Sequence, residues 1–258
     1  MSRSENRRHL VIPDTQTRRG VDLSYLKWVG RAIVEYKPDV VIHLGDHWDM
    51  PSLSSYDPVG SIKREGADYK EDVKAGNAGF EMLTDPMYSV ITKNGKKGKW
   101  NPERIFLRGN HEQRIERAIN SDPKYRSTIG YGDLDTKDFK IYPYLEKVFV
   151  DGIVYSHFFQ NSLSSFAIGG SIDNRLNKIG ESFVQGHQQG LMYGNRVFPT
   201  GKTRHGLVAG SCYLHDEDYK GLQGNGHWRG IVVLNEVRDG DYDIMPLSMD
   251  FLRRRFGK

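Results

Sequence analysis

The chain has 258 residues, of which 37 are Lys or Arg and 33 are Asp or Glu, giving a net charge of +4. A chain of this length can bury a substantial core, and we expect one domain spanning residues 1–258. The small positive charge is compatible with a phosphate-bearing substrate, but by itself it does not indicate nucleic-acid binding.

Cys212 is the only cysteine, which excludes a disulfide within the chain and disfavours a thiolate metal cluster. We therefore expect a reducing, cytoplasmic location. No segment approaches the roughly 18 consecutive apolar residues of a membrane span. The Arg-rich start lacks the apolar core of a signal peptide, so no membrane association is expected. The sequence does not indicate an oligomeric state.

The first half of the chain alternates between strand-like and helix-like patterns. Short apolar runs predict strands at residues 8–13, 39–45 and 104–109, and helical spacing predicts helices at residues 22–37, 67–84 and 111–119. The helix at 67–84 is the weakest of these predictions because it contains Gly76 and Gly79.

The second half is richer in strands. Apolar runs predict strands at residues 151–157, 182–187, 206–214, 229–237 and 242–247, with one short helix at 171–180. Cys212 is placed inside one of these strands. The alternation favours the α/β class, and the C-terminal strands indicate a second or extended sheet.

The predicted strands of this chain end on residues that can bind a metal or transfer a proton. Five strand ends carry Asp14, Asp46, the pair Asn110 and His111, His157, and His187. One such residue would be an ordinary turn residue, but five together predict a shared site, because ligands of α/β sheets bind at the carboxyl ends of strands. Carboxylate, amide and imidazole donors suit Mn, Fe, Zn or Mg.

These residues fall into five spaced blocks: "DTQ" (14–16), "GDHWD" (45–49), "GNHE" (109–112), His157, and "GHQQ" (186–189). Their order resembles the D-x-H, G-D-x-x-D, G-N-H-E/D, lone His and G-H-x-H blocks of the calcineurin-like metallophosphoesterases. The resemblance implies a four-layer αββα sandwich of two mixed β-sheets flanked by helices. It also implies hydrolysis of phosphate esters by attack of a metal-bound hydroxide at phosphorus, between two clamping ions.

The resemblance further implies two divalent ions, with Mn preferred and Mg, Fe, Zn or Ni as alternatives. By matched motif, one ion would be held by Asp46, Asn110, His157 and His187, and the other by Asp14, Gln16, Asp46 and Gln189. His111 would donate a proton or stabilise the oxyanion, with Asp49 as its orienting partner. Glu112 would support the site or simply occupy the first turn of a helix.

The chain departs from the family at Gln16 and Gln189, where the family has histidines. Glutamine can coordinate through its carbonyl oxygen, but it is neutral and harder than imidazole. Three consequences remain open. The first is a weak site that prefers Mn or Mg, the second is one tightly bound ion with the other arriving only with substrate, and the third is loss of catalysis, which leaves a binding protein.

Arginines near the motifs are candidates for binding phosphate, whose oxygens match the guanidinium fork. They are Arg18, Arg19 and Arg114, and ordinary solvated charge is the alternative, which we favour for Arg117. The aromatic residues Trp48, Tyr56 and Trp228 offer base stacking, with core packing as the alternative. The acidic segment from His215 to Asp218 is interpreted as an ordinary turn.

Three functions are compatible with these motifs. The favoured one is a metal-dependent phosphodiesterase or nuclease acting on a nucleotide or nucleic acid. The second is a phosphomonoesterase, including a protein phosphatase, and the third is a catalytically weakened metal-binding scaffold. The same metal site serves the first two functions, so the motifs do not distinguish them.

Overall fold

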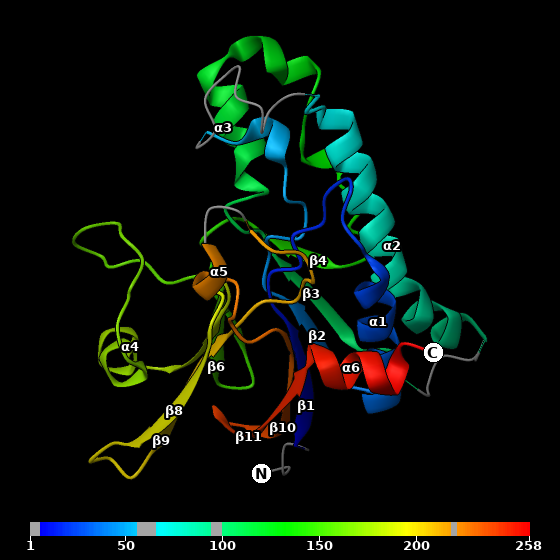
Figure 1. Cartoon of the computed structure of the whole chain (residues 1–258). Helices are drawn as coiled ribbons and strands as arrows, with labels where there is room; N and C mark the ends of the chain where they lie inside the picture. The colour runs from blue at the N-terminus through cyan, green and yellow to red at the C-terminus, as the bar shows by residue number, and fades with distance from the viewer. Residues whose placement is uncertain (1–5, 56–65, 94–99, 218–220) are drawn as a thin grey trace.

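The computed structural model describes residues 6–55, 66–93, 100–217 and 221–258. Two mixed β-sheets lie face to face, and helices flank them on both sides (Figure 1). The fold class predicted from the sequence, α/β with two mixed sheets flanked by helices, is therefore confirmed. Among the described residues, none of the helices has the length and apolar character needed to cross a membrane.

The first sheet has six strands in the order β11-β10-β1-β2-β3-β4. Its four parallel strands are β1 (Arg7–Ile12), β2 (Val40–His43), β3 (Glu103–Leu107) and β4 (Lys140–Tyr142). Its antiparallel strands are β10 (Gly230–Arg238) and β11 (Asp241–Ser248). Because β1, β2 and β3 are parallel neighbours, their carboxyl ends lie along the same edge.

The second sheet has five strands in the order β5-β6-β7-β9-β8. Its parallel core consists of β6 (Ile153–Ser156), β7 (Ser182–Gln185) and β9 (Thr203–Ala209). The antiparallel edge strands are β5 (Val148–Val150) and β8 (Leu191–Val197).

Alternate residues of a strand pack into different hydrophobic cores. In β1, Leu10 and Ile12 pack toward the helices α1 (Ser24–Tyr36), α2 (Tyr69–Lys93) and α6 (Met249–Phe256), whereas Val11 faces the second sheet. The outer face of the second sheet is covered by α4 (Ile172–Ile179), which buries Leu176 against Phe183. Three apolar cores thus separate four layers of secondary structure.

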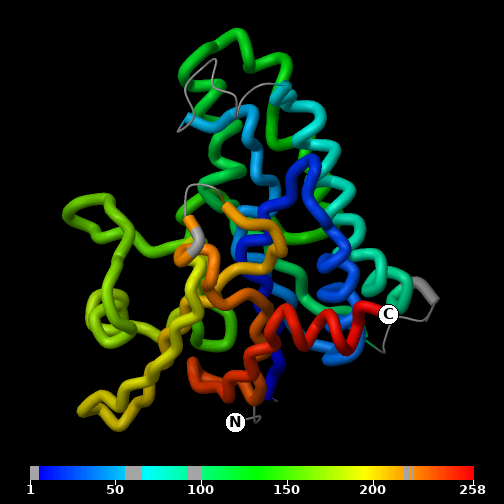
Figure 2. The backbone as a smooth tube through the Cα atoms, in the orientation of Figure 1, coloured from blue at the N-terminus to red at the C-terminus, as the bar shows by residue number. Residues whose placement is uncertain are grey.

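The chain between β3 and β4 forms a lobe beside one end of α2 (Figure 2). It contains α3 (Gln113–Ser121), η3 (Pro123–Ser127) and η4 (Tyr131–Asp133). Asn77 of α2 holds this lobe by donating from Nδ2 to the carbonyl of Asp133, 3.0 Å away. Two further short segments are η1 (Pro51–Leu53) and α5 (Gly221–Gly224).

Some elements differ from the sequence-based prediction. The edge strands β4, β5 and β8 were not predicted, because they are short or largely exposed. The helix α6 was missed although Met249, Leu252 and Phe256 are buried at helical spacing. Cys212 is buried but lies beyond β9, since Gly210 takes a left-handed conformation (φ +79°) that ends the extended pairing. Helix α2 continues through Pro86 to Lys93 instead of ending at residue 84.

Gly76, which weakened the helix prediction, is explained by the packing of α2 against Trp48. The Trp48 side chain is fully buried, and a Cβ at position 76 would lie 1.8 Å from its Cδ1 atom. The indole Nε1 donates to Asn77 Oδ1 on the same helix at 3.0 Å. The glycine therefore makes room for a ring that anchors the end of the "GDHWD" loop.

We expect Gly76→Ala to lower the free energy of unfolding by about 2 kcal/mol. Overpacking a buried ring costs up to about 3 kcal/mol, and the helix propensity of alanine recovers about 1 kcal/mol. Urea unfolding of the variant measures the loss. Gly132→Ala is the matched control, because no atom lies within 4 Å of a Cβ at that position. Equal stabilities of the two variants would contradict the proposed role of Gly76.

Candidate metal centre

The five strand ends carry their polar side chains to one place between the two sheets. Asn110 Oδ1 lies 3.0 Å from His157 Nε2 and 2.8 Å from His187 Nδ1. Asp46 Oδ2 lies 3.4 Å from the same nitrogen of His157. Asp14 joins the group by accepting the backbone N–H of His187 at 3.0 Å. The structure thus brings together residues from β1, β2, β3, β6 and β7.

Three of these residues are arranged as a metal site would require. One ligand atom each from Asp46, His157 and His187 lies within 4.8 Å of the other two. The Nδ1–H of His157 donates to the carbonyl of Leu44 at 2.7 Å, so Nε2 faces the centre, where it would offer a lone pair to a cation once it loses its proton. Such a hydrogen bond on the far side of the ring is the usual way to orient a histidine ligand.

Two oxygens of the proposed ligand residues are buried without a hydrogen-bond partner in the described structure: Asp14 Oδ2 and Gln16 Oε1. Leaving such atoms unsatisfied is costly. Burial, and then the charge of Asp46, raise the pKa of the Asp14 carboxyl to about 7. A cation beside Asp14 and Asp46 would satisfy Asp14 Oδ2 and relieve the repulsion between the two carboxylates, so these residues fit a divalent metal ion.

Three candidate ligands occupy the left-handed region of backbone conformation. The φ angles of Gln16, Asp46 and His187 are 43°, 50° and 63°. Few residues other than glycine adopt this conformation, and each occurrence costs free energy. The surrounding contacts must therefore hold these turns in place, and strain of this kind clusters at functional sites.

Glu112 supplies the main contacts that hold the turn at Asp46. Its fully buried carboxylate accepts backbone N–H groups from Gly109, Asp46, His47 and Trp48 at 2.8, 3.0, 2.7 and 3.0 Å. A Cβ at Gly109 would lie 2.1 Å from Asp46 Oδ1, so only glycine allows the two loops to approach this closely. Of the two roles considered for Glu112, the structure shows the supporting one.

A second buried network fixes the loop after β1. Thr15 Oγ1 lies 2.6 Å from His47 Nδ1 and 3.1 Å from His43 Nε2, and His47 Nε2 lies 3.0 Å from the carbonyl of Gly76. Both histidines are fully buried. They connect the first two motifs to helix α2 and lie outside the group of converging ligands.

His111 lies beside the centre and contacts Asp49. Its Nδ1 is 2.7 Å from Asp49 Oδ1, and its Nε2 is 3.7 Å from Asp46 Oδ2. Burial and the charge of Arg114 oppose protonation of the ring, but Asp46 and Asp49 outweigh them and raise the pKa of His111. The same ion pair holds the pKa of Asp49 below its usual range despite burial. The imidazole thus has a carboxylate on each side.

The three arginines predicted to bind phosphate have different surroundings. Arg114 is buried, donates from Nη1 to the carbonyls of Asp49 and Met50 at 2.7 and 3.2 Å, and approaches His111 Nε2 at 3.3 Å. Arg18 donates from Nη1 to Asp49 Oδ2 at 3.0 Å. Arg19 is exposed, as is Arg117 on α3.

The two glutamines of the motifs also differ. Gln16 is buried, and its Oε1 has no partner among the described residues. Gln189 is half-buried, and its Oε1 accepts a hydrogen bond from the Tyr213 hydroxyl at 2.7 Å. The carbonyl oxygen of Gln189 is thus engaged by a protein group, whereas that of Gln16 is not.

Of the aromatic residues considered for base stacking, Trp48 shows the alternative, core packing. Trp48 is wholly buried and packs on Phe80 and Phe106, so it cannot stack on a base. Trp228 is half-buried against Gly210. Tyr56 and Asp218 lie outside the described residues.

The acidic segment after β9 is not an ordinary exposed turn. Glu217 is buried, and both of its carboxylate oxygens accept from Arg18 Nη1 at 3.2 Å. No local sequence pattern indicates this contact, because the two residues are 199 positions apart.

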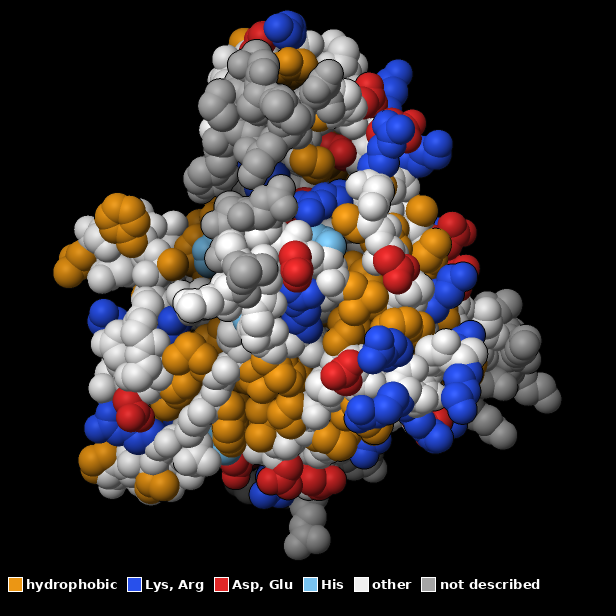
Figure 3. Space-filling view, viewed as in Figure 1, with side chains coloured by type: hydrophobic (Ala, Val, Ile, Leu, Met, Phe, Trp, Pro, Cys, Tyr) orange, Lys and Arg blue, Asp and Glu red, His pale blue; other side chains and the backbone are white. Residues whose placement is uncertain are grey.

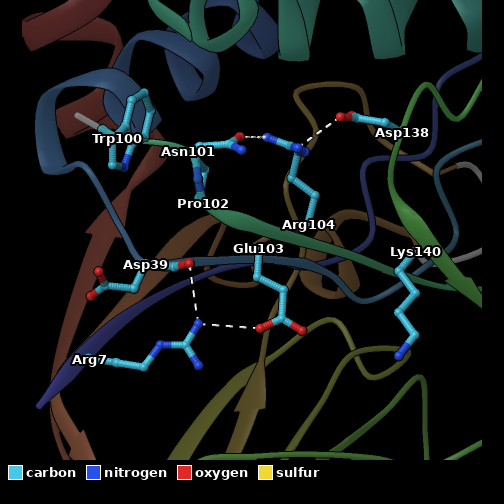
Figure 4. Close-up of a pocket in the computed structure, with 9 residues that line it drawn as sticks. All are labelled: Arg7, Asp39, Trp100, Asn101, Pro102, Glu103, Arg104, Asp138 and Lys140. Atoms are coloured by element: carbon cyan, nitrogen blue, oxygen red, sulfur yellow. Dashed lines mark hydrogen bonds and ion pairs between the residues drawn. The ribbon is translucent and has the colours of Figure 1, made fainter. Parts of the chain in front are cut away.

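A hollow lies at the amino ends of β1 to β4, the ends opposite the converging side chains (Figure 4). Its volume is about 670 Å³. Four of its charged side chains form two ion pairs, Arg7 with Glu103 at 3.3 Å and Arg104 with Asp138 at 2.8 Å, and the Asp39 carboxylate accepts the backbone N–H of Arg8 at 2.7 Å. This hollow therefore offers no set of uncompensated ligands comparable with the converging group.

No known family model matches the chain, and no curated protein matches it either. Similar solved structures include a conserved uncharacterized protein, a predicted phosphoesterase, from Streptococcus pneumoniae TIGR4. It is 12% identical, with 96% of this chain and 92% of that chain covered and a TM-score of 0.37. Vps29 from Chaetomium thermophilum is 9% identical, with coverages of 93% and 97% and a TM-score of 0.36. These values are too low for either protein to bear on the chemistry of the site.

If the converging group binds a metal, Mn²⁺ should raise the melting temperature of the protein. An ion at 100 times its dissociation constant stabilises the folded state by about 2.7 kcal/mol, or about 5–10 °C for a chain of this size. We expect His157→Ala to lose most of this increase. Differential scanning fluorimetry with and without Mn²⁺ measures it.

His227→Asn is the matched control for this experiment, because His227 lies outside the converging group and contacts Ser211 Oγ and the Gly224 carbonyl. It should keep the full metal-dependent increase. An equal increase in His157→Ala and wild type would exclude His157 as a ligand.

Proposed function

We propose that the protein is a metal-dependent phosphodiesterase acting on a nucleotide or nucleic-acid substrate. The observation that carries the proposal is the convergence of Asp14, Asp46, Asn110, His157 and His187, with two buried oxygens left without hydrogen bonds. The five motif blocks of the calcineurin-like metallophosphoesterases contain these same residues. Ligand sets of this type support hydrolysis at phosphorus.

In this proposal, one ion is held by Asp46, Asn110, His157 and His187, and a second, weaker one by Asp14, Gln16, Asp46 and Gln189. When bound, the divalent ions neutralise charge that develops on the phosphate oxygens. We propose Mn²⁺ as the preferred ion, because the second ligand set offers oxygens alone. A cytoplasmic location fits the single cysteine, Cys212, which is buried.

His111 is the proposed general acid. Its Nδ1 contacts Asp49, and its Nε2 is turned toward Asp46. A proton on Nε2 can therefore be donated to a leaving oxygen at the centre, while Asp49 stabilises the ring orientation and its positive charge. Arg114, 3.3 Å from Nε2, adds a second positive group on that side.

The hydrogen bonds that Arg18 and Arg114 already make favour a phosphodiester substrate over a phosphomonoester. Arg18 Nη1 is already shared between Asp49 and Glu217, and Arg114 Nη1 is bonded to two backbone carbonyls. A monoester dianion needs more positive charge than a diester, which carries one negative charge. On the face seen in Figure 3, basic side chains are interspersed with acidic ones. Such a mixed surface is better suited to binding a single phosphodiester group than to binding along a long nucleic-acid backbone.

The proposal predicts Mn²⁺-dependent hydrolysis of bis-p-nitrophenyl phosphate and single-stranded DNA that exceeds hydrolysis of p-nitrophenyl phosphate. His111→Ala should lower kcat about 10²–10⁴-fold, because a general acid contributes that much. Its metal content should be unchanged, since His111 is not among the proposed ligands. Steady-state kinetics and elemental analysis measure the two quantities.

Faster cleavage of the monoester would refute the diesterase assignment, and no cleavage of any of the three substrates would leave the protein a metal-binding scaffold. A His111→Ala variant with near-normal kcat would show that His111 is not the acid. His227→Asn again serves as the control, with unchanged activity expected.

The glutamines predict unequal metal affinities. Calorimetry with Mn²⁺ should show one tight and one loose ion in wild type, because imidazole is the better ligand for these metals. The double variant Gln16→His/Gln189→His should bind the second ion more tightly. Two equally tight ions in wild type, unchanged in the variant, would show that neither glutamine is a ligand.

A further inference from the structure

We infer that Arg18 and Glu217 are positioning residues, which hold Asp49 against His111 and so fix the orientation of the imidazole. This inference rests on the proposed function, in which His111 is the general acid. It gives Arg18 a positioning role in place of the phosphate-binding role expected from the sequence. It also gives a role to Glu217, a residue outside all five motif blocks.

Four side chains form a continuous chain of charges. Both oxygens of Glu217 lie 3.2 Å from Arg18 Nη1, and the same nitrogen lies 3.0 Å from Asp49 Oδ2. The other oxygen of Asp49, Oδ1, lies 2.7 Å from His111 Nδ1. Signs alternate along the chain when His111 is protonated, so each contact is attractive.

The chain is well shielded from water. The side chains of Asp49 and Glu217 are 7% and 9% exposed, and that of Arg18 is 26% exposed. Charge contacts in such surroundings are screened less than those on the surface. All the hydrogen bonds that the guanidinium of Arg18 makes to described residues go through Nη1 to these two carboxylates.

Glu217 is held firmly enough to orient Arg18. Its backbone N–H donates to Asn225 Oδ1, and its carbonyl accepts from Asn225 Nδ2, both at 2.9 Å. His215 Nε2 lies 2.9 Å from Glu217 Oε1. Arg229 fixes the preceding turn by donating to the carbonyl of Leu214 at 2.7 Å. The carboxylate of Glu217 is therefore held in one position, unlike a carboxylate in an exposed acidic turn.

Glu217 acts on His111 through two intermediates and not on the substrate. Its side chain bonds to Arg18 and His215 within the described structure, and to none of the converging ligands. Removing its charge leaves Arg18 with Asp49 as its remaining carboxylate partner, so Arg18 can rotate and pull Asp49 away from His111. Misplacement of a catalytic group affects the reaction step more than substrate binding.

The first test compares Glu217→Gln with Asp216→Asn on bis-p-nitrophenyl phosphate with Mn²⁺. Glu217→Gln should lower kcat about 10-fold, a fraction of what the general acid contributes, and leave KM within about 2-fold. Asp216 is exposed and pairs with Arg229, so its variant should behave as wild type. An unchanged kcat in Glu217→Gln would overturn the inference. So would a fall in KM, which would mean that Glu217 competes with substrate phosphate for Arg18.

A double-variant cycle tests whether Glu217 acts through Arg18. Arg18→Met should lower kcat, and adding Glu217→Gln to it should lower kcat no further, because the intermediate is already missing. If the decreases in kcat caused by the two single substitutions multiplied in the double variant, Glu217 would not act through Arg18.

A final measurement needs no catalysis. In ¹⁵N spectra of the metal-free protein at one fixed pH, the imidazole signals of His111, assigned by their absence in His111→Ala, should shift in Glu217→Gln but not in Asp216→Asn. Unshifted signals in Glu217→Gln would overturn the inference. Inactive wild-type protein with shifted His111 signals would refute the proposed function and leave the positioning role intact.

Discussion

The candidate centre depends on one buried carboxylate, that of Glu112. It accepts four backbone N–H groups from two different loops, and so ties the turn after β2 to the turn after β3. Together with the backbone N–H of His111, which donates to Asp46 Oδ1 at 2.9 Å, it holds Asp46 in its left-handed conformation beside Gly109. An ionised carboxylate is suited to this task, because hydrogen bonds to a charged acceptor are stronger than those between neutral groups.

Once Asp46 is fixed, the rest of the centre follows from strand geometry. The parallel strands β1, β2 and β3 of one sheet and β6 and β7 of the other bring Asp14, Asn110, His157 and His187 to the same place. Burial, and then repulsion from the nearby carboxylate of Asp46, raise the pKa of Asp14 to about 7. The fold therefore accumulates negative charge and unsatisfied oxygens, and a bound cation is the simplest means of balancing both.

The sequence allowed prediction of the parts of this arrangement that depend on local pattern. Apolar runs locate the buried strands, and the polar residue after each run must lie at a carboxyl end, so the convergence of Asp46 and His157 was predictable. The contact between Arg18 and Glu217 was not, because it joins two loops from opposite ends of the chain. The edge strand β8 escaped prediction for another reason: its residues are largely exposed, so they need no apolar alternation.

The two glutamines show why a motif position alone does not define a ligand. At position 189, Tyr213 donates a hydrogen bond to the amide oxygen, so this oxygen already has a partner within the protein. At position 16, the side chain is buried on a left-handed residue, and its oxygen has no protein partner in the described structure. A cation at Gln16 Oε1 would offset the cost of that arrangement. Gln16 is therefore the stronger candidate for a direct ligand, and Gln189 can become one only by giving up its contact with Tyr213.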